Sequence, residues 1–467
     1  MKLDKFLALS AYAVQAFATL GLVFAVSRLL SGAEYGHYSL IVASAQSAAV
    51  LGFEWVRLAA ARFCANTAHD DVRPKKDTIQ FAFALATLVI GVLVAVAVAL
   101  GAVGIHEAVL GLIVAVLIGL TDLLLVFLRT QGSFNQFAML QMLRAFTLLA
   151  CSIIGAYKSQ SALGALTGLA FGYGFSLLVY ILAAPAWWVW RFSNVRSVLF
   201  KEMAVYGVSV AAASNIHLQV PLLVRWVGKA FLSAEGFAGL SLAMDILQKP
   251  FALVTSAIGG VLTPAVIVEF EKGQDLRSPK LRQIYEIQIW AVLLLLGLSI
   301  AFLPDVASLV VRAEMQTWVV QFGPPVAIMF AAHALIQSTI AIPGHLLHKG
   351  LRLIVHATFE LACVALFICG ALYFDFLRPF LWVWLGCLAA ALSIFFAFPL
   401  VKEVPCDRPV QAVYFAITVS ALLGALYLLP TQTSFLLMGL KVVLALVICA
   451  TGVWAYKPYF RRASIEG

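Results

Sequence analysis

Long apolar runs alternate with short polar segments along the whole chain. A helix that spans a membrane needs about 20 mostly apolar residues, and fourteen segments of the sequence meet this requirement. Their predicted limits are 6–30, 36–61, 79–103, 108–128, 136–156, 162–190, 203–226, 235–267, 284–303, 317–343, 353–374, 380–400, 411–429 and 435–456. In the tenth segment we expect the helix to begin at Pro324 or Pro325, because proline suits a first helical turn. The pattern predicts an all-α, polytopic membrane protein.

Composition agrees with this pattern. Of the 467 residues, 63% are hydrophobic and 11% are charged, whereas soluble domains carry roughly 25% charged residues. A chain this apolar could not cover itself with polar surface in water. The apolar run at the N-terminus is longer than the core of a signal peptide and is followed by no small-residue cleavage site, so we interpret it as a retained first helix.

Basic residues are divided unevenly between the two sets of loops. One set holds about 21 lysines and arginines, and the other holds Arg28, Lys158, Lys229, Arg312 and Arg378. Loops rich in basic residues stay in the cytoplasm. Both termini are therefore predicted to be cytoplasmic, which requires an even number of helices. The net charge of +9 is therefore explained by topology, and no nucleic-acid partner is expected. The seven cysteines lack zinc-type spacing, so we expect no metal site and no cofactor.

A short internal repeat predicts two halves. LSGAEYGHYSL (Leu30 to Leu40) aligns without gaps to LSAEGFAGLSL (Leu232 to Leu242), at an offset of 202 residues, or six helices. Duplicated halves are common in secondary transporters, which bind substrate at their interface. We predict an N-terminal lobe of six helices (1–202), a C-terminal lobe of six more (203–410), and an appended helix pair with a cytoplasmic tail (411–467).

Charged residues inside the predicted spans indicate where function resides, because each costs at least a few kcal/mol in lipid and usually faces a cavity. Guanidinium groups pair well with the anionic oxygens of a diphosphate. The candidate substrate-binding residues are Arg28, Arg57, Arg144, Arg225 and Lys249. A buried carboxylate can change its ionisation between two states of a transporter. The candidate ion-coupling residues are Asp122, Asp245, Glu360 and His356, of which the last two are four apart and share a helix face.

Structural roles are the alternatives for these residues. Arg28 and Arg225 lie near helix ends and could snorkel to the interface, and Lys441 is expected to do so. Residues three or four apart share a helix face, so neighbouring opposite charges could simply neutralise each other. Such local pairs are Glu54 with Arg57 and Asp245 with Lys249. For His356, a hydrogen-bonded packing role is the alternative.

Two prolines predict irregular points in the seventh and eighth helices. Proline has no N–H to donate, so Pro221 frees the carbonyl of His217 and Pro250 frees that of Ile246. Such breaks are tolerated in membranes where they line a cavity or are otherwise satisfied. These helices either bend during a transport cycle or carry a static kink.

Four segments, taken in their order along the chain, combine small residues with an aromatic and a basic residue, which is an arginine in the first three and Lys249 in the last. They are SRLLSGAEYGHYSL, LGFEWVRLAAARF, FLRTQGSFNQFAMLQMLRA and LSAEGFAGLSLAMDILQKP. The chain resembles flippases of the multidrug/oligosaccharidyl-lipid/polysaccharide exporter (MOP) superfamily, in particular the Wzx-type flippases of O-antigen and exopolysaccharide units. This resemblance implies two six-helix lobes around a central cavity, alternating access, and an undecaprenyl-diphosphate-linked oligosaccharide as cargo. It also implies that Arg28 and Arg57 line the cavity, with Lys249 where relatives have an arginine in helix 8.

These observations predict a secondary transporter of a bacterial inner membrane that flips a lipid-linked oligosaccharide. It would serve O-antigen, exopolysaccharide or capsule biosynthesis, with membrane lipid, a polysaccharide polymerase and export proteins as partners. No GxxxxGK[ST] phosphate loop is present, so an ion gradient would supply the energy. A drug or metabolite exporter and a lipid II-type flippase are the alternatives. The predicted outer loops are too short to carry the catalytic groups of a membrane enzyme, so no enzyme is expected.

Overall fold

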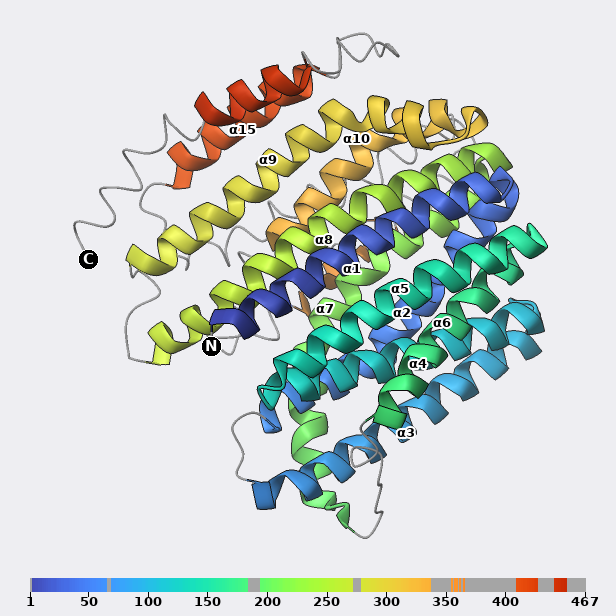
Figure 1. Cartoon of the computed structure of the whole chain (residues 1–467), viewed down its shortest axis with the longest axis vertical. Helices are drawn as coiled ribbons and strands as arrows, with labels where there is room; N and C mark the ends of the chain where they lie inside the picture. The colour runs from blue at the N-terminus through green and yellow to red at the C-terminus, as the bar shows by residue number, and fades with distance from the viewer. Residues whose placement is uncertain are drawn as a thin grey trace. The chain divides into compact units, whose positions relative to one another are not determined.

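The computed structural model describes residues 2–64, 69–183, 194–271, 279–336, 354–355, 357–359, 361–362, 364–365, 409–426 and 441–451. Regular structure within these residues is helical throughout (Figure 1). The helices are α1 (Lys2–Leu29), α2 (Gly32–Phe63), α3 (His69–Ala99), α4 (Ile105–Thr130), α5 (Phe134–Ser159), α6 (Ala162–Ala183), α7 (Ser197–Phe231), α8 (Ala234–Glu271), α9 (Pro279–Val310), α10 (Ala313–Ile336) and α15 (Pro409–Ala425). A further helix, Lys441–Thr451, follows α15.

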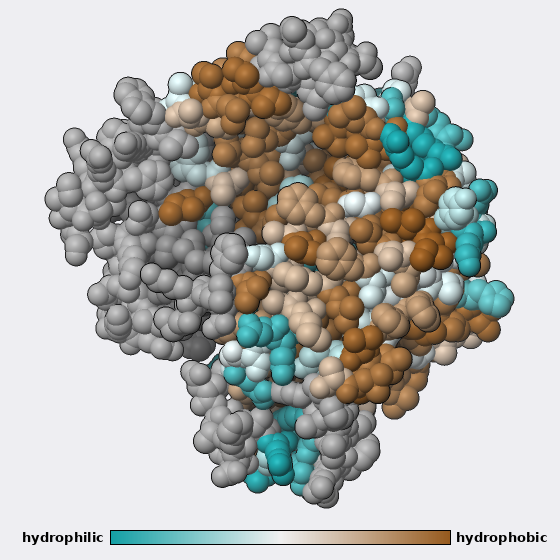
Figure 2. Space-filling view, in the orientation of Figure 1, coloured by the Kyte–Doolittle hydropathy of each residue, from teal (hydrophilic) through white to brown (hydrophobic). Residues whose placement is uncertain are grey.

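Nine helices in the described part are long and apolar enough to cross a membrane. Helix α3 shows the reason clearly, because it exposes a row of large aliphatic side chains that includes Leu88, Leu93 and Val96. Apolar residues also cover much of the coloured surface in Figure 2. A continuous exposed apolar surface of this kind is unfavourable in water and suits lipid. The chain is therefore an all-α, multi-pass membrane protein, as the sequence predicts.

The described helices form two compact units, Met1–Leu223 and Val224–Gly467, and α7 passes from one to the other. In the first unit, α5 packs against α1 and α6, and α2 packs against α4. A core of Leu124, Leu128, Leu140 and Tyr180 joins α4, α5 and α6. In the second unit, α10 packs against α8 and α9, and α15 packs against α9. The finer division at residues 202 and 410 stays a prediction.

The two repeat segments adopt the same local structure. In each, a leucine amide closes the last turn of one helix, with Leu30 bonded to Val26 and Leu232 to Gly228, both at 3.0 Å. The serine that follows caps the next helix. The hydroxyl of Ser31 accepts from the amide of Glu34 at 3.4 Å, and that of Ser233 accepts from Gly236 at 3.1 Å. Serine suits this position because its side chain satisfies an otherwise unpaired amide.

Two predicted helix limits are wrong. Helix α10 begins at Ala313, so Pro324 and Pro325 lie in its interior and do not start it. The amide of Gln316 begins the helix by bonding the carbonyl of Arg312 at 3.2 Å. Helix α9 continues past its predicted end at 303 to Val310 and so includes Asp305. The predicted span followed the apolar run, which ends at Leu303 before Pro304 and Asp305, but proline is tolerated within membrane helices.

Candidate functional site

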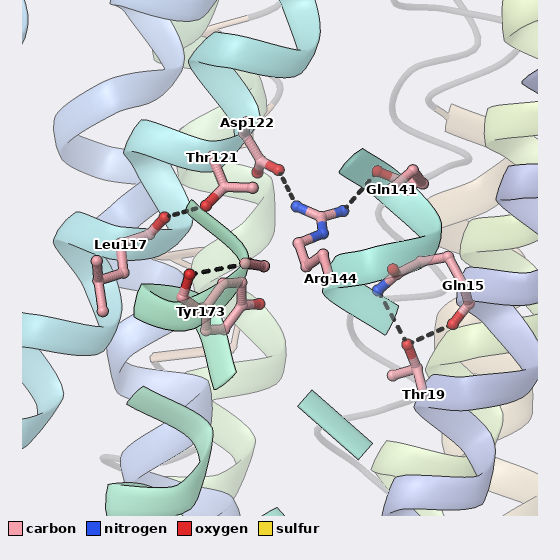
Figure 3. A network of polar contacts seen from close by, with 9 residues as sticks. Gln15, Thr19, Leu117, Thr121, Asp122, Gln141, Arg144 and Tyr173 are labelled. Carbon is pink, nitrogen blue, oxygen red and sulfur yellow. Dashed lines mark hydrogen bonds and ion pairs between the residues drawn. The ribbon is translucent and has the colours of Figure 1, made fainter. Parts of the chain in front are cut away.

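An arginine and an aspartate from two helices form the centre of a polar cluster in the first unit. Nη1 of Arg144, on α5, donates to a carboxylate oxygen of Asp122, on α4, at 2.7 Å. Nη2 of Arg144 donates to the amide oxygen of Gln141, one turn earlier on α5, at 3.0 Å. Figure 3 shows the guanidinium pointing between these two acceptors. The Arg144 side chain is 10% exposed and that of Asp122 is 38% exposed, so the pair is open from the carboxylate side.

A second pair lies on one face of α2. Arg57 donates through Nη2 to the carboxylate of Glu54, three residues earlier. The carboxylate of Asp122 also lies close enough to interact electrostatically with Arg57, as does Tyr12 of α1. The local pair that the sequence suggested is therefore present. It belongs to a larger group of charges that α4 and α5 complete.

Helices α1 and α6 complete the surroundings of these charges. Tyr173 of α6 interacts electrostatically with both Arg144 and Asp122. On α1, the amide of Gln15 donates to the Thr19 hydroxyl at 3.3 Å, and Figure 3 shows Gln15 and Thr19 beside α5, against which α1 packs. We call the group the first-unit polar cluster. Its members are Tyr12, Gln15, Glu54, Arg57, Asp122, Gln141, Arg144 and Tyr173.

Small residues bring α6 close enough to α5 to place Tyr173. A Cβ added at Gly168 would overlap the carbonyl oxygen of Cys151, so only glycine permits this approach. The hydroxyl of Thr147 crosses to the α6 backbone and donates to the carbonyl of Gly172 at 3.0 Å. Close packing of small residues is a common means of holding membrane helices together. Here this packing holds Gly172, which directly precedes Tyr173, against Thr147. Thr147 lies about one turn from Arg144 on α5.

Three polar atoms of the cluster are buried without a hydrogen-bond partner in the described part of the chain. They are Nε of Arg57, Nε of Arg144 and Oε1 of Gln15. A buried donor without an acceptor costs roughly 1–3 kcal/mol. Each guanidinium therefore keeps an N–H that could donate a hydrogen bond to an incoming anionic oxygen.

The second unit holds a separate charge group where α7 meets α8. Nη2 of Arg225 donates to Asp245 at 2.7 Å, and the two side chains are 4% and 16% exposed. Lys249 interacts electrostatically with both. Sequence spacing suggested that Asp245 pairs with Lys249, but its close partner is Arg225. The reason is that a short turn joins α7 to α8, so that Arg225 near the end of α7 lies beside Asp245 near the start of α8. The spacing along α8 alone does not show this.

One candidate and one expected anchor have unexpected environments. Arg28 is exposed in the last turn of α1, whereas Tyr12 and Gln15 are the α1 residues beside the first-unit polar cluster. Lys441 is buried and does not snorkel: its Nζ lies 2.6 Å from a carboxylate oxygen of Asp305. The sequence analysis missed this pair because it ended α9 before Asp305. His356 and Glu360 lie outside the described residues.

Glutamines and tyrosines of the cluster were also missed. Their signal was weak but present, since Gln15 and Gln141 are polar residues inside apolar spans, and Gln141 lies three residues from Arg144 on the same helix face. The candidates chosen from the sequence were all ionisable, so these glutamines were not among them. Whether the candidates of the first unit and those of the second converge on one cavity stays a prediction.

No protein-family model matches this sequence, and no curated protein matches it. Solved structures do. The lipid II flippase MurJ, in an inward closed conformation, is similar over 98% of this chain and 100% of its own, with a TM-score of 0.68 and 11% identity. An inward-facing multidrug resistance MATE family transporter of the MOP superfamily is similar over 87% and 95% of the two chains, with a TM-score of 0.58 and 14% identity. The fold is that of the MOP-superfamily transporters.

A third solved structure with the MOP fold is described by the polarity of its binding pocket. It is a MOP superfamily transporter from Pyrococcus furiosus, described as having a binding pocket of reverse polarity that suggests a different function. It is similar over 85% of this chain and 94% of its own, with a TM-score of 0.54 and 15% identity. Proteins with the MOP fold thus include a multidrug resistance transporter and a lipid II flippase. A shared fold does not fix the cargo, which has to be argued from the charges of the site.

Proposed function

We propose that this chain is a secondary transporter that flips an undecaprenyl-diphosphate-linked oligosaccharide across a bacterial inner membrane for O-antigen, exopolysaccharide or capsule biosynthesis. The observation that carries this proposal is the pair of arginines in the first-unit polar cluster, each with a buried N–H that has no acceptor. Charges kept within membrane spans mark substrate or ion pathways more often than structural ties. The MOP fold supports a transport role for these charges.

Phosphate chemistry fits these arginines. A guanidinium carries five N–H donors in a planar fork and can bind phosphate oxygens in pairs. Arg144 uses Nη1 for Asp122 and Nη2 for Gln141, which leaves Nε and further N–H groups for a ligand. The anionic head group of a lipid-linked sugar supplies the matching acceptors. Arg225 and Lys249 of the second unit and Arg28 are the further proposed cargo contacts.

The carboxylates provide a means of coupling. When a diphosphate takes over the guanidinium of Arg144, Asp122 loses its positive partner and becomes more costly to keep charged. Uptake of a proton or another cation by Asp122 then restores neutrality. Asp245 stands in the same relation to Arg225, so both acids are proposed to link cargo binding to an ion gradient. His356 and Glu360 remain proposed coupling residues.

The test replaces Arg57 and Arg144 with alanine, singly, and measures lipid-linked sugar that accumulates facing the cytoplasm. We expect each change to reduce export about tenfold or more, because a charge-assisted hydrogen bond is lost. Arg144→Lys should restore part of the activity, since lysine keeps the charge but not the fork. Lys158→Ala, at the exposed end of α5, is the matched control. Normal export by fully inserted Arg57→Ala and Arg144→Ala proteins would exclude the proposed cargo contacts.

A drug or metabolite exporter is the second candidate, and one observation favours it. Each arginine of the first-unit polar cluster has a carboxylate partner, Glu54 for Arg57 and Asp122 for Arg144, so the cluster carries no surplus positive charge. A cationic, amphipathic cargo could bind the half-exposed Asp122. Growth of expressing cells in cationic dyes separates the two candidates: resistance that depends on Asp122, with unchanged lipid-linked sugar, supports the exporter.

A further inference from the structure

A buried ion pair joins α9 to the helix Lys441–Thr451. Nζ of Lys441 lies 2.6 Å from Oδ2 of Asp305 although the residues are 136 positions apart. Their side chains are 5% and 10% exposed, respectively. Because the carboxylate comes from α9 and the ammonium from a helix near the C-terminus, the pair exists only when these two helices are in contact.

Apolar residues surround the pair. Ala301 of α9, Leu423 and Val419 of α15, and Ala445 of the Lys441–Thr451 helix form one buried core. The Phe302 ring lies 5.7 Å from the Lys441 ammonium.

Further charges near the pair are few within the described residues. Helix α15 contains no charged residue. On α10, Glu314 is the charged residue nearest in sequence to Asp305, and its carboxylate lies 3.8 Å from the Arg312 guanidinium in an exposed pair. The other acidic, basic and histidine residues of the described helices that pack on α9 are His333 on α10 and Glu235, Asp245, Lys249, Glu269 and Glu271 on α8, and α9 itself carries Lys280, Arg282 and Glu286. Lys441 and Asp305 therefore balance each other's charge in an apolar environment.

Stability alone is a weak reason to keep this pair. Replacing a buried ion pair by apolar residues of similar size is often neutral or stabilising, because two charges no longer have to be desolvated. The core around Asp305 and Lys441 would accept apolar side chains readily. A charged pair at such a position is better explained by a reaction in which the charges take part.

Lysine distinguishes this pair from the three arginine–carboxylate pairs on the described spanning helices, of which only Arg225–Asp245 is similarly buried. Arginine cannot be deprotonated in proteins, whereas a buried lysine can give up its proton. A site that exchanges a proton for another cation needs such a group. Of these four pairs, therefore, Asp305–Lys441 is the one whose cation can leave as a proton.

We propose that Asp305 and Lys441 form a site that exchanges a proton for a small monovalent cation such as Na⁺. The cation binds the Asp305 carboxylate, the Lys441 ammonium gives up one proton to water, and neutral lysine remains. The charge of the buried site is zero before and after, since one positive charge enters as one leaves. This balance avoids the cost of an uncompensated charge in an apolar interior.

The backbone beside Asp305 supplies a further ligand for the cation. Pro304 precedes Asp305 within α9 and has no N–H, so the carbonyl of Ile300 lacks its usual helical donor. Small hard cations bind carboxylate and carbonyl oxygens. Ile300 and Asp305 are five residues apart on the same helix, so the proposed site draws its carboxylate and its carbonyl from neighbouring turns.

Sodium binding can be measured on the purified full-length protein without any cargo. NaCl, compared with choline chloride at equal ionic strength, should raise the melting temperature by about 2 °C at alkaline pH and less at mildly acidic pH. Added NaCl should also release about one proton per protein in weakly buffered solution. Use of the site to drive transport rests on the proposed function, but these two measurements do not.

Lys441→Arg is the decisive variant, because arginine keeps the ion pair but holds its proton. It should fold and melt as the wild type does. It should lose both the rise in melting temperature with NaCl and the release of a proton. The double variant Asp305→Leu/Lys441→Met should also fold and lose both effects, and the exposed-pair control Arg312→Gln/Glu314→Gln should keep both. Sodium responses that persist in Lys441→Arg, or that the wild type lacks, overturn the proposal and leave a purely structural tie.

Discussion

At the residue scale, most charges inside the described spans are paired, and the pairing is set by neighbouring helices as much as by sequence spacing. Glu54 and Arg57 pair along one helix, as their spacing predicts. Asp245 could have paired with Lys249 in the same way, but Arg225 of the preceding helix holds it. A guanidinium from a neighbouring helix can approach a carboxylate with direct geometry, whereas side chains on one helix reach each other only along its surface.

The thiol of Cys64 provides a test of burial at the residue scale. Cys64 lies just after α2, outside its span, and burial raises its pKa to about 12. The reactive species is the thiolate, and a raised pKa keeps the thiol protonated at neutral pH and well above it. We expect very slow maleimide labelling of Cys64 from neutral pH to pH 9 in the folded protein.

Peptide mass spectrometry can follow this labelling, with an SDS-unfolded sample as the control. In SDS the burial is lost and Cys64 should label rapidly at the same pH. Equal labelling of Cys64 in the folded and the SDS-treated protein would show that this thiol is accessible.

At the element scale, α5 and α6 are joined by small residues that hold the first-unit polar cluster in place. Gly168 lies against the α5 backbone at Cys151, and Gly172 accepts the hydrogen bond of Thr147. The sequence shows the glycines but not which neighbour they face. The sequence equally fails to show that Tyr173, directly after Gly172, interacts electrostatically with Arg144 and Asp122.

Gly168→Ala and Gly174→Ala make a matched pair on α6. A methyl group at Gly168 overlaps backbone, which cannot move aside, so we expect destabilisation of about 1–3 kcal/mol. Gly174 has no atom within 4 Å of an added Cβ, and alanine is the better helix former, so this change should be neutral or stabilising by up to about 1 kcal/mol. Melting curves of the purified variants measure both. A Gly168→Ala protein as stable as Gly174→Ala would show that the two helices are not in close contact.

At the scale of the whole molecule, two observations agree on duplication. The segments around Ser31 and Ser233 have the same helix end, serine cap and helix start, and each begins a long helix. The contacts divide the chain into two units of similar size. The equal spacing predicts that equivalent helices of the two halves cross the membrane in the same direction, since six helices separate them.

The location of the termini tests the helix count. An even number of spans places both ends on one side, and the bias of basic residues makes that side the cytoplasm. Fusions of green fluorescent protein to either terminus should fluoresce, and alkaline phosphatase fusions at the same sites should be inactive. An active phosphatase at one terminus only would require an odd number of spans.

The sequence by itself determined the fold class, the main spans and the types of residue in the site. Hydrophobic runs long enough for a membrane are local properties of the chain, and serine before a helix needs no distant partner. Arg57, Arg144 and Asp122 could be chosen from the sequence because a charge inside an apolar run is costly wherever its helix lies.

Only the tertiary structure decided which of these charges meet. Asp305 and Lys441 are 136 residues apart. Periodicity assigns a residue to a face of its own helix but does not say which helix packs there. Ion pairs between helices depend on that packing, because each partner has to be brought within reach by a neighbouring helix.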